Sequence, residues 1–265
     1  MVPAHARGGG RVLDRSLQLK RRYVLTALVC VALAACARRG SDTTARRPAD
    51  RGARDTPVRL PADRDARLRY VALGDSTVEG IGESTPDRTY VQRLHARLRE
   101  VYPRAELENL GVGGATSFDV KQKQLPKAVM RRPDLVTLSV GPNDITGRIG
   151  ADTFEKNVDT IFRTLRAQPE TVVVTTLLPD LGVTPRFRDT PERDAVSRRS
   201  DEFNGVLRRL AKAHGVVLVD LYEPSRAEVP RRPELVAGDG YHPSDIGYAR
   251  WAELMWQVIG PLAAH

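Results

Sequence analysis

The sequence predicts an α/β domain in which a parallel sheet is covered by helices on both faces. From Leu68 onwards, short apolar runs rich in Val and Leu alternate with longer segments whose apolar residues recur at helical spacing. Parallel strands need a crossover between them, so regular strand–helix alternation is typical of a parallel sheet. Five strands and five helices within about 200 of the 265 residues indicate one three-layer α/β/α sandwich.

The expected elements follow one another along the chain. The strands are expected at Arg69–Leu73, Ala105–Leu110, Leu135–Val140, Thr171–Thr176 and Val216–Asp220. The helices are expected at Tyr90–Val101, Ser117–Val129, Thr153–Ala167, Ala195–His214 and Ser244–Ile259. The longest irregular stretch, Leu177–Asp194, is a loop that could border a functional site.

The N-terminal segment is typical of an export signal and is not expected to belong to the folded domain. A basic stretch ends at Lys20-Arg21-Arg22, and an apolar run of 13 residues, Tyr23–Ala35, follows it. This run is too short to cross roughly 30 Å of hydrocarbon as a helix, and the order is typical of a secretory signal. The end of the run, Leu33-Ala34-Ala35-Cys36, resembles the lipobox of bacterial lipoproteins. We therefore expect a signal peptide at 1–35 and lipidation of Cys36, with an ordinary cleaved signal as the alternative.

The segment after Cys36 reads as a tether. Residues 36–67 are rich in Arg, Asp, Ala, Pro and Thr and contain few large apolar side chains. Such a composition buries too little surface to offset the entropy lost on ordering. We expect a lipidated N-terminus and flexible linker that hold the domain at the extracytoplasmic face of the cell membrane, or a secreted protein if Cys36 is not lipidated.

The positive charge of the chain is concentrated in the same region. Residues 1–69 hold 16 Lys and Arg against 6 Asp and Glu, whereas the remaining residues hold 26 against 27. A nucleic-acid-binding domain carries its positive charge as a patch on the folded surface, so we expect no nucleic-acid partner. Both cysteines, Cys30 and Cys36, also lie in this region. The folded part therefore has no disulfide, and the sequence shows no cluster of metal ligands.

Polar motifs follow the first and third expected strands, at the sheet edge where ligands of such folds bind. The first strand runs into Gly74-Asp75-Ser76-Thr77, which could expose the Ser76 hydroxyl or simply cap a helix. The third runs into Gly141-Pro142-Asn143-Asp144, where Asn143 could present an amide donor or belong to a turn.

Glycines follow the second strand in Gly111-Val112-Gly113-Gly114-Ala115-Thr116. Clustered glycines let backbone N–H groups approach a ligand closely. A dinucleotide-binding loop is the rival interpretation, but its Gly-x-Gly-x-x-Gly pattern would need glycine where Thr116 stands, and it belongs after the first strand. We expect no nucleotide cofactor.

The last motif, Asp239-Gly240-Tyr241-His242-Pro243, precedes the final helix. An aspartate and a histidine three residues apart can meet across one tight turn. The carboxylate then accepts the Nδ1 proton, which leaves Nε2 free to act as a base.

In this order and at these strand ends, the four motifs resemble the SGNH hydrolases, also called the GDSL esterase/lipase family. The resemblance extends from Arg69 to about Ile259, which makes 68–265 the hydrolase domain. Many members have Leu where this chain has Thr77. The glycine of the second motif corresponds best to Gly114 and less well to Gly113.

The resemblance implies a flavodoxin-like five-stranded parallel sheet of order 2-1-3-4-5 and a serine esterase without cofactor or metal. It implies Ser76 as nucleophile, His242 as base and Asp239 as its orienting carboxylate. The oxyanion hole would consist of the N–H groups of Ser76 and Gly114 with the Asn143 amide. Asp75 and Asp144 are expected to be hydrogen-bond acceptors that shape the loops.

The resemblance leaves the substrate open among small esters, lipids and acetylated glycans. The sequence shows no long apolar lid, which favours short-chain esters. Two other functions stay open: an acyltransferase with the same triad, and an envelope-binding lipoprotein without catalysis. We expect a monomer.

Overall fold

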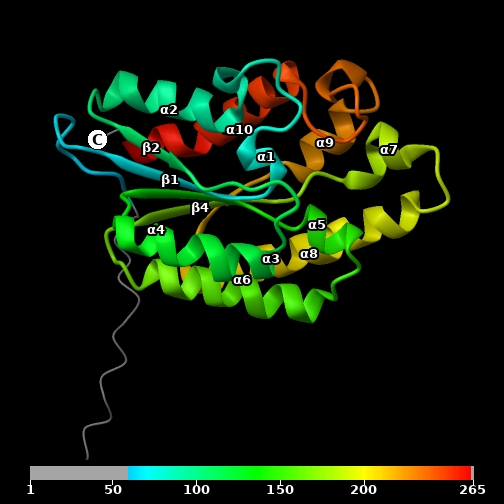
Figure 1. Cartoon of the computed structure of the whole chain (residues 1–265), viewed down its shortest axis with the longest axis horizontal. Coiled ribbons are helices and arrows are strands. Elements are labelled where there is room, and N and C mark those ends of the chain that lie inside the picture. Colours follow the sequence, from blue (N-terminus) through cyan, green and yellow to red (C-terminus); the bar gives the residue numbers. More distant parts are fainter. Residues whose placement is uncertain (1–58, 264–265) are drawn as a thin grey trace, which may run out of the picture. The chain divides into compact units, whose positions relative to one another are not determined.

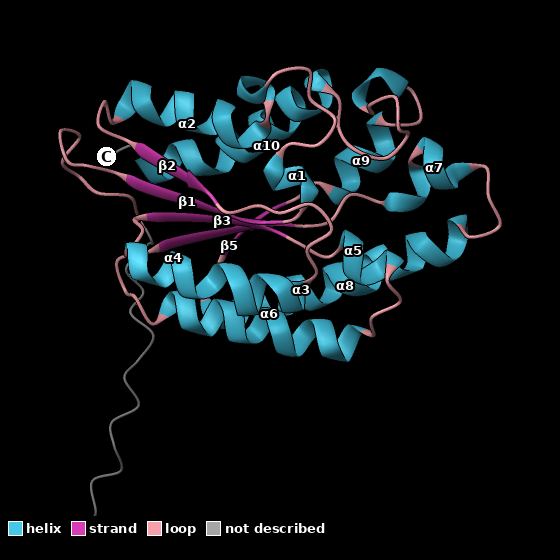
Figure 2. Cartoon of the chain, in the orientation of Figure 1, coloured by secondary structure: helices cyan, strands magenta, loops and turns pink. Residues whose placement is uncertain are grey.

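The computed structural model describes residues 59–263, which contain one sheet of five parallel strands between layers of helices (Figures 1 and 2). The strand order is β2-β1-β3-β4-β5, so the predicted fold class and order are confirmed. Each strand begins and ends within one residue of its predicted bounds. The strands are β1 Arg69–Gly74, β2 Glu106–Asn109, β3 Leu135–Ser139, β4 Val172–Thr176 and β5 Val217–Val219.

The long helices follow the predicted pattern, and short ones lie between them. The helices are α1 Ser76–Glu79, α2 Tyr90–Val101, α3 Ser117–Asp119, α4 Leu125–Arg131, α5 Pro142–Thr146, α6 Ala151–Arg166, α7 Pro185–Arg188, α8 Arg193–His214, α9 Tyr222–Glu228 and α10 Asp245–Ala263. Helices α1, α5, α7 and α9 were not predicted, because four to seven residues are too few for a periodic pattern. Two of them, α1 and α5, begin in the motifs that follow β1 and β3.

One predicted helix, Ser117–Val129, is wrong as a continuous element. The chain forms α3, then a π-turn at Val120–Gln124, then α4. Pro126 lies in the first turn of α4, has no N–H to donate and would clash with the carbonyl four residues earlier. A wider π-turn before the proline accommodates both constraints.

The core lies on both faces of the sheet. Helices α2 and α10 cover one face, and α4, α6 and α8 cover the other (Figure 1). Strands β3 and β4 are buried along their whole length, which explains why they appear in the sequence as continuous apolar runs. On the first face Tyr90 stacks on Trp251, and on the second Phe154 stacks on Phe203.

Residues just before the expected start of the hydrolase domain at residue 68 contact that domain. Leu60 is only 2% exposed, and its backbone N–H donates to the Leu262 carbonyl at 3.0 Å. The Tyr102 hydroxyl donates to the Pro61 carbonyl at 2.9 Å. One anchored leucine and two hydrogen bonds hold this segment on the domain although its average composition is polar.

The predicted signal peptide, the lipidation site at Cys36 and the linker up to residue 58 lie outside the described residues. Within residues 59–263, no helix is long and apolar enough to cross a membrane.

The topology brings the four motifs together. Strand β1 pairs with β2 on one side and with β3 on the other, all in parallel. The chain therefore leaves β1 and β3 at the same edge of the sheet, where the strand order reverses. Ser76, Gly114 and Asn143 follow β1, β2 and β3 at this edge.

Candidate active site

Ser76 is held by the backbone turn between β1 and α1. Gly74 has a φ of 149°, and a Cβ there would lie 2.0 Å from the Ser139 carbonyl oxygen, so only glycine fits. Asp75 caps α1: its Oδ1 accepts from the Thr77 N–H at 2.9 Å and from the Thr77 hydroxyl at 2.8 Å. The motif is thus a helix cap that also makes Ser76 the first residue of α1. The Ser76 N–H consequently has no acceptor within the helix.

His242 lies between Ser76 and Asp239. Its Nε2 is 2.9 Å from the Ser76 Oγ, and its Nδ1 is 2.5 Å from the Asp239 Oδ2. The other carboxylate oxygen of Asp239 accepts the backbone N–H groups of Tyr241 at 2.9 Å and His242 at 3.0 Å. Gly240, with a φ of 73°, allows this tight turn. The structure therefore brings these three predicted residues into one hydrogen-bonded line.

The electrostatics of the line fix the state of the imidazole. Burial raises the pKa of Asp239, but hydrogen bonds from the His242 ring and from two backbone N–H groups outweigh it, so the pKa lies below its ordinary value. An ionised Asp239 can only accept a hydrogen bond, so its contact with Nδ1 requires a proton on that ring nitrogen. The Nε2 atom is then an acceptor for the Ser76 hydroxyl.

Gly114, in the loop after β2, and Asn143, in the first turn of α5, lie next to each other. The Asn143 Nδ2 donates to the Ala115 carbonyl at 3.0 Å, which uses one of its two N–H bonds. The Gly113 N–H donates to Glu79 Oε2 at 2.6 Å, whereas the Gly114 N–H has no acceptor within residues 59–263. Gly114 has a φ of 77° and no atom within 4 Å of the position a Cβ would take. Of the two candidate glycines, Gly114 has the free donor.

Behind these loops lies a buried polar network. The Asp144 carboxylate accepts from the Ser117 N–H at 2.8 Å and from its hydroxyl at 2.5 Å. Asn157 of α6 donates to the Ser117 hydroxyl at 3.0 Å. In the π-turn, the Gln124 amide bonds both the N–H and the carbonyl of Gly74, at 2.8 and 2.7 Å. The expected loop-shaping role of Asp75 and Asp144 is confirmed, whereas Glu79, Ser117, Gln124 and Asn157 carried no signal in the sequence.

Comparison with known proteins agrees with this geometry. Residues 72–250 match the model of the GDSL-like Lipase/Acylhydrolase family. The chain belongs to this family. Members of the family hydrolyse acyl esters, and this chain is accordingly a carboxylic ester hydrolase.

Individual relatives of this GDSL hydrolase share its fold and part of its sequence. An acetylxylan esterase of Geobacillus stearothermophilus is 26% identical over 181 residues, which cover 64% of this chain and 80% of the relative. The crystal structure of the acetyl xylan esterase AlAXEase has a TM-score of 0.61 at 22% identity, over 72% of this chain and 100% of the other. The crystal structure of TesA has a TM-score of 0.61 at 21% identity, over 74% and 99%. At such identities the two crystal structures show the shared fold.

A cleft opens beside Ser76 and His242 in this hydrolase. Its volume is about 890 Å³, which includes open solvent at its mouth. Three elements surround it: α9, α10 and the loop that follows β4. Part of the predicted loop Leu177–Asp194 does border the site, because Pro179, Leu181 and Thr184 line the cleft. Elsewhere in residues 59–263, no group of three or more His, Cys, Asp or Glu side chains could hold a metal ion.

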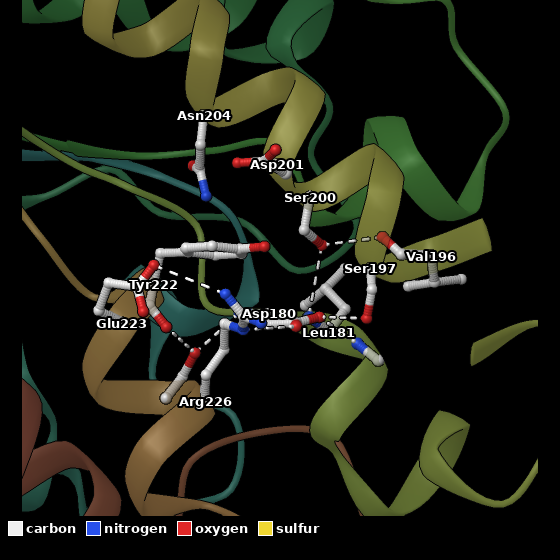
Figure 3. Close-up of polar contacts among 12 residues, drawn as sticks. Asp180, Leu181, Val196, Ser197, Ser200, Asp201, Asn204, Tyr222, Glu223 and Arg226 are labelled. Carbon is white, nitrogen blue, oxygen red and sulfur yellow. Dashed lines mark hydrogen bonds and ion pairs between the residues drawn. The ribbon is translucent and has the colours of Figure 1, made fainter. Parts of the chain in front are cut away.

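Buried hydrogen bonds fix the loop that lines the cleft (Figure 3). The Asp180 Oδ1 accepts from the Ser197 hydroxyl of α8 at 2.7 Å, and the Asp180 N–H donates to the Ser225 hydroxyl of α9 at 2.8 Å. Asn204 of α8 bonds both the N–H and the carbonyl of Leu178, at 2.7 and 3.0 Å. The loop is therefore hydrogen-bonded to α8 on one side and to α9 on the other.

Proposed function

We propose that this hydrolase cleaves carboxylic esters through an acyl-enzyme on Ser76. The observation that carries the proposal is the hydrogen-bonded line from Ser76 through His242 to Asp239. In the first step, the Ser76 Oγ attacks the ester carbonyl carbon while its proton passes to His242 Nε2. Collapse of the tetrahedral intermediate breaks the bond to the alcohol, which leaves with the proton from His242.

In the second step, water attacks the acyl-enzyme. His242 takes a proton from the water, and the new tetrahedral intermediate releases the carboxylic acid as the Ser76 Oγ regains that proton. Asp239 stays ionised throughout, holds the Nδ1 proton and stabilises the imidazolium. An alcohol in place of water would make the same site an acyltransferase.

The oxyanion of both intermediates needs donors opposite the base. We assign this role to the N–H groups of Ser76 and Gly114 and to the second N–H of the Asn143 side chain. The free N–H groups at the start of α1 and at Gly114 support the assignment. Donors fixed before the reaction stabilise developing charge without a reorganisation cost.

A fluorophosphonate probe tests the nucleophile directly. We expect the probe to label the wild-type protein, and both labelling and hydrolysis of a p-nitrophenyl ester to fall at least about 10⁴-fold in Ser76→Ala and His242→Gln. Thr153→Ala removes an exposed hydroxyl on α6, outside the cleft, and should leave both readouts unchanged. Persistent labelling of Ser76→Ala would refute the assignment, and a fully folded wild-type protein that takes no probe would favour a non-catalytic binding role.

The proposal leaves one choice of substrate, between an acetyl group on a glycan and a longer acyl chain. The acetylxylan esterase relative favours the former. The chemistry of the cleft favours the latter.

A further inference from the structure

The cleft beside Ser76 is a half-open recess whose exposed wall is mostly apolar. Most of its wall consists of side chains that are themselves buried, among them Leu181, Leu221, Leu235 and Trp251. It begins at Ser76 and His242 and continues along α9 and α10. A group attached to the Ser76 Oγ could therefore extend into the protein.

Most polar side chains of this wall already have hydrogen-bond partners, whereas the Tyr241 hydroxyl and the Trp251 Nε1 have none among the described residues. The hydroxyl of Thr184 donates its proton to the Leu181 carbonyl at 2.6 Å, and that of Ser225 donates to the Tyr222 carbonyl at 2.7 Å. Each hydroxyl has only one proton, so neither retains a donor for a ligand. Recognition of a carbohydrate requires many donors and acceptors, and the unpartnered Tyr241 hydroxyl and Trp251 N–H are few for a ligand with several hydroxyl groups.

The two oppositely charged residues of the wall neutralise each other. Arg250 of α10 makes a bidentate pair with Glu228 of α9, with Nη2 to Oε1 at 2.8 Å and Nε to Oε2 at 3.1 Å. A fork-to-carboxylate pair of this geometry satisfies both groups. The pair joins the two helices, and the exposed surface of the remaining wall is mostly apolar, although serine and threonine side chains also line it.

The length of the cleft can be read from α10. Gly247, Arg250, Trp251 and Leu254 line it from one helical face. Seven residues of helix advance about 10 Å, and α10 begins only three residues after His242, so Leu254 is the end far from the catalytic line. An extended aliphatic chain of about eight carbons spans a similar distance, since each C–C bond of about 1.5 Å is inclined to the chain axis.

We infer that this cleft holds the acyl group of the substrate and that the enzyme prefers linear acyl chains of about six to ten carbons. The inference rests on the proposed acyl-enzyme at Ser76. The acyl group stays on the serine while the alcohol departs and water enters, so a mostly apolar recess beside the serine suits the acyl side of the ester. This inference differs from the preference for short-chain esters that is expected from the sequence, and the experiment below decides between the two.

The size of the preference follows from the hydrophobic effect. Each methylene group transferred from water to an apolar wall increases kcat/KM by about fourfold. From acetyl to octanoyl the increase should exceed a hundredfold, and beyond about ten carbons it should stop, because the additional carbons pass Leu254. A series of acetyl esters with alcohols of increasing length should show no comparable increase.

The experiment uses p-nitrophenyl esters from acetyl to hexadecanoyl with the wild-type protein, Leu254→Trp and Leu262→Trp. Leu254 and Leu262 are both half-buried on α10, but only Leu254 lines the cleft. Filling the far end in Leu254→Trp should lower the ratio of octanoyl to acetyl kcat/KM at least tenfold. Leu262→Trp should keep the wild-type ratio.

The outcomes separate the inference from the proposed function. If no ester is hydrolysed in a Ser76-dependent manner, the proposed function fails and the inference fails with it. If Ser76-dependent hydrolysis is fastest with acetyl, or if the ratio is the same in Leu254→Trp and the wild type, only the acyl cleft is overturned. A preference that follows alcohol length instead would assign the cleft to the leaving group and overturn the inference as well.

Discussion

The two sides of the Ser76 hydroxyl are built differently. On the base side, Asp239 and His242 lie three residues apart in one turn, and the Asp239 side chain is 43% exposed. On the oxyanion side, Asn143 lies in α5 and Gly114 in the loop after β2, and the two segments are held together by fully buried Asp144 and Ser117. One side depends on spacing within five residues, and the other depends on contacts between segments far apart in the chain.

This difference shows where activity is sensitive to distant substitutions. The base side restores its geometry whenever its turn forms, because the Asp239 carboxylate and the N–H groups it accepts belong to the same turn. The oxyanion side holds its geometry only as long as α3, α5 and α6 keep their packing. Substitutions in the buried network should therefore lower turnover without direct contact with the substrate, as displacements of about 1 Å do in preorganised sites.

The largest effect should come from removing the oxyanion donor itself. Asn143→Ala should reduce kcat by about 10²–10³-fold, or about 3–4 kcal/mol, because the donor acts mainly in the transition state. KM should change much less. Steady-state kinetics would measure both, with thermal unfolding to verify the fold. Thr146→Ala, at the exposed end of the same helix, provides the control. A variant with kcat within threefold of the wild type would exclude Asn143 from the oxyanion hole.

The carboxylates under the site give a second test, through pH and stability. Complete burial raises the pKa of Asp75 to about 6, against the hydrogen bonds from Thr77. Because the pKa of Asp75 is higher in the folded than in the unfolded state, its protonated form stabilises the fold. This stabilisation is complete below about pH 4 and is lost as the pH rises through about 6. On the base side, the lowered pKa of Asp239 has the opposite sign: its contribution is lost as the pH falls.

Asp75→Asn should abolish the contribution of Asp75 while an amide oxygen still caps α1. Relative to the wild type, the variant should gain up to about 3 kcal/mol of unfolding free energy between pH 4 and pH 7, from a shift of about two pKa units. Urea unfolding at several pH values measures the difference. Parallel stability curves for the two proteins would mean that Asp75 does not titrate in this range.

The contrast between the base side and the oxyanion side also explains which parts of the structure could be predicted from the sequence. The strands and the Asp239–His242 pair follow from local patterns, namely buried apolar runs and a three-residue spacing, and both were located within about one residue. The acceptors that hold the loops were partly visible, because Asp75 and Asp144 lie inside the motifs.

The rest of the site depends on pairings that no spacing encodes. Gln124 contacts Gly74 across 50 residues and Asn157 contacts Ser117 across 40. Leu254 and Glu228 become part of the cleft only through the packing of α10 against α9. Likewise, Leu60 could be recognised as a domain residue only once its partners on the domain were known.

The smallest expected effect probes the connection between the two sides. Glu79 ends the helix that begins with Ser76, and its carboxylate accepts the Gly113 N–H at 2.6 Å, one residue before the free donor of Gly114. Removing this acceptor in Glu79→Ala should let the loop move and lower kcat by about tenfold with little change in KM, since a charge-assisted hydrogen bond contributes about 1.5–3 kcal/mol.

Glu79→Gln retains an oxygen that can accept the same N–H, so it should recover most of the lost turnover. Glu83→Ala removes a neighbouring carboxylate that makes no hydrogen bond to this loop, and it should behave as the wild type. A similar loss of kcat in Glu79→Ala, Glu79→Gln and Glu83→Ala would indicate that the total negative charge of this region matters. Equal kcat values for Glu79→Ala and Glu79→Gln, both well below wild type, would show that the negative charge matters rather than the position of the glycine loop. A loss of kcat in Glu79→Ala that Glu79→Gln recovers would mean that α1 positions the Gly113–Gly114 loop through this hydrogen bond. One short helix would then set the geometry on both sides of the nucleophile.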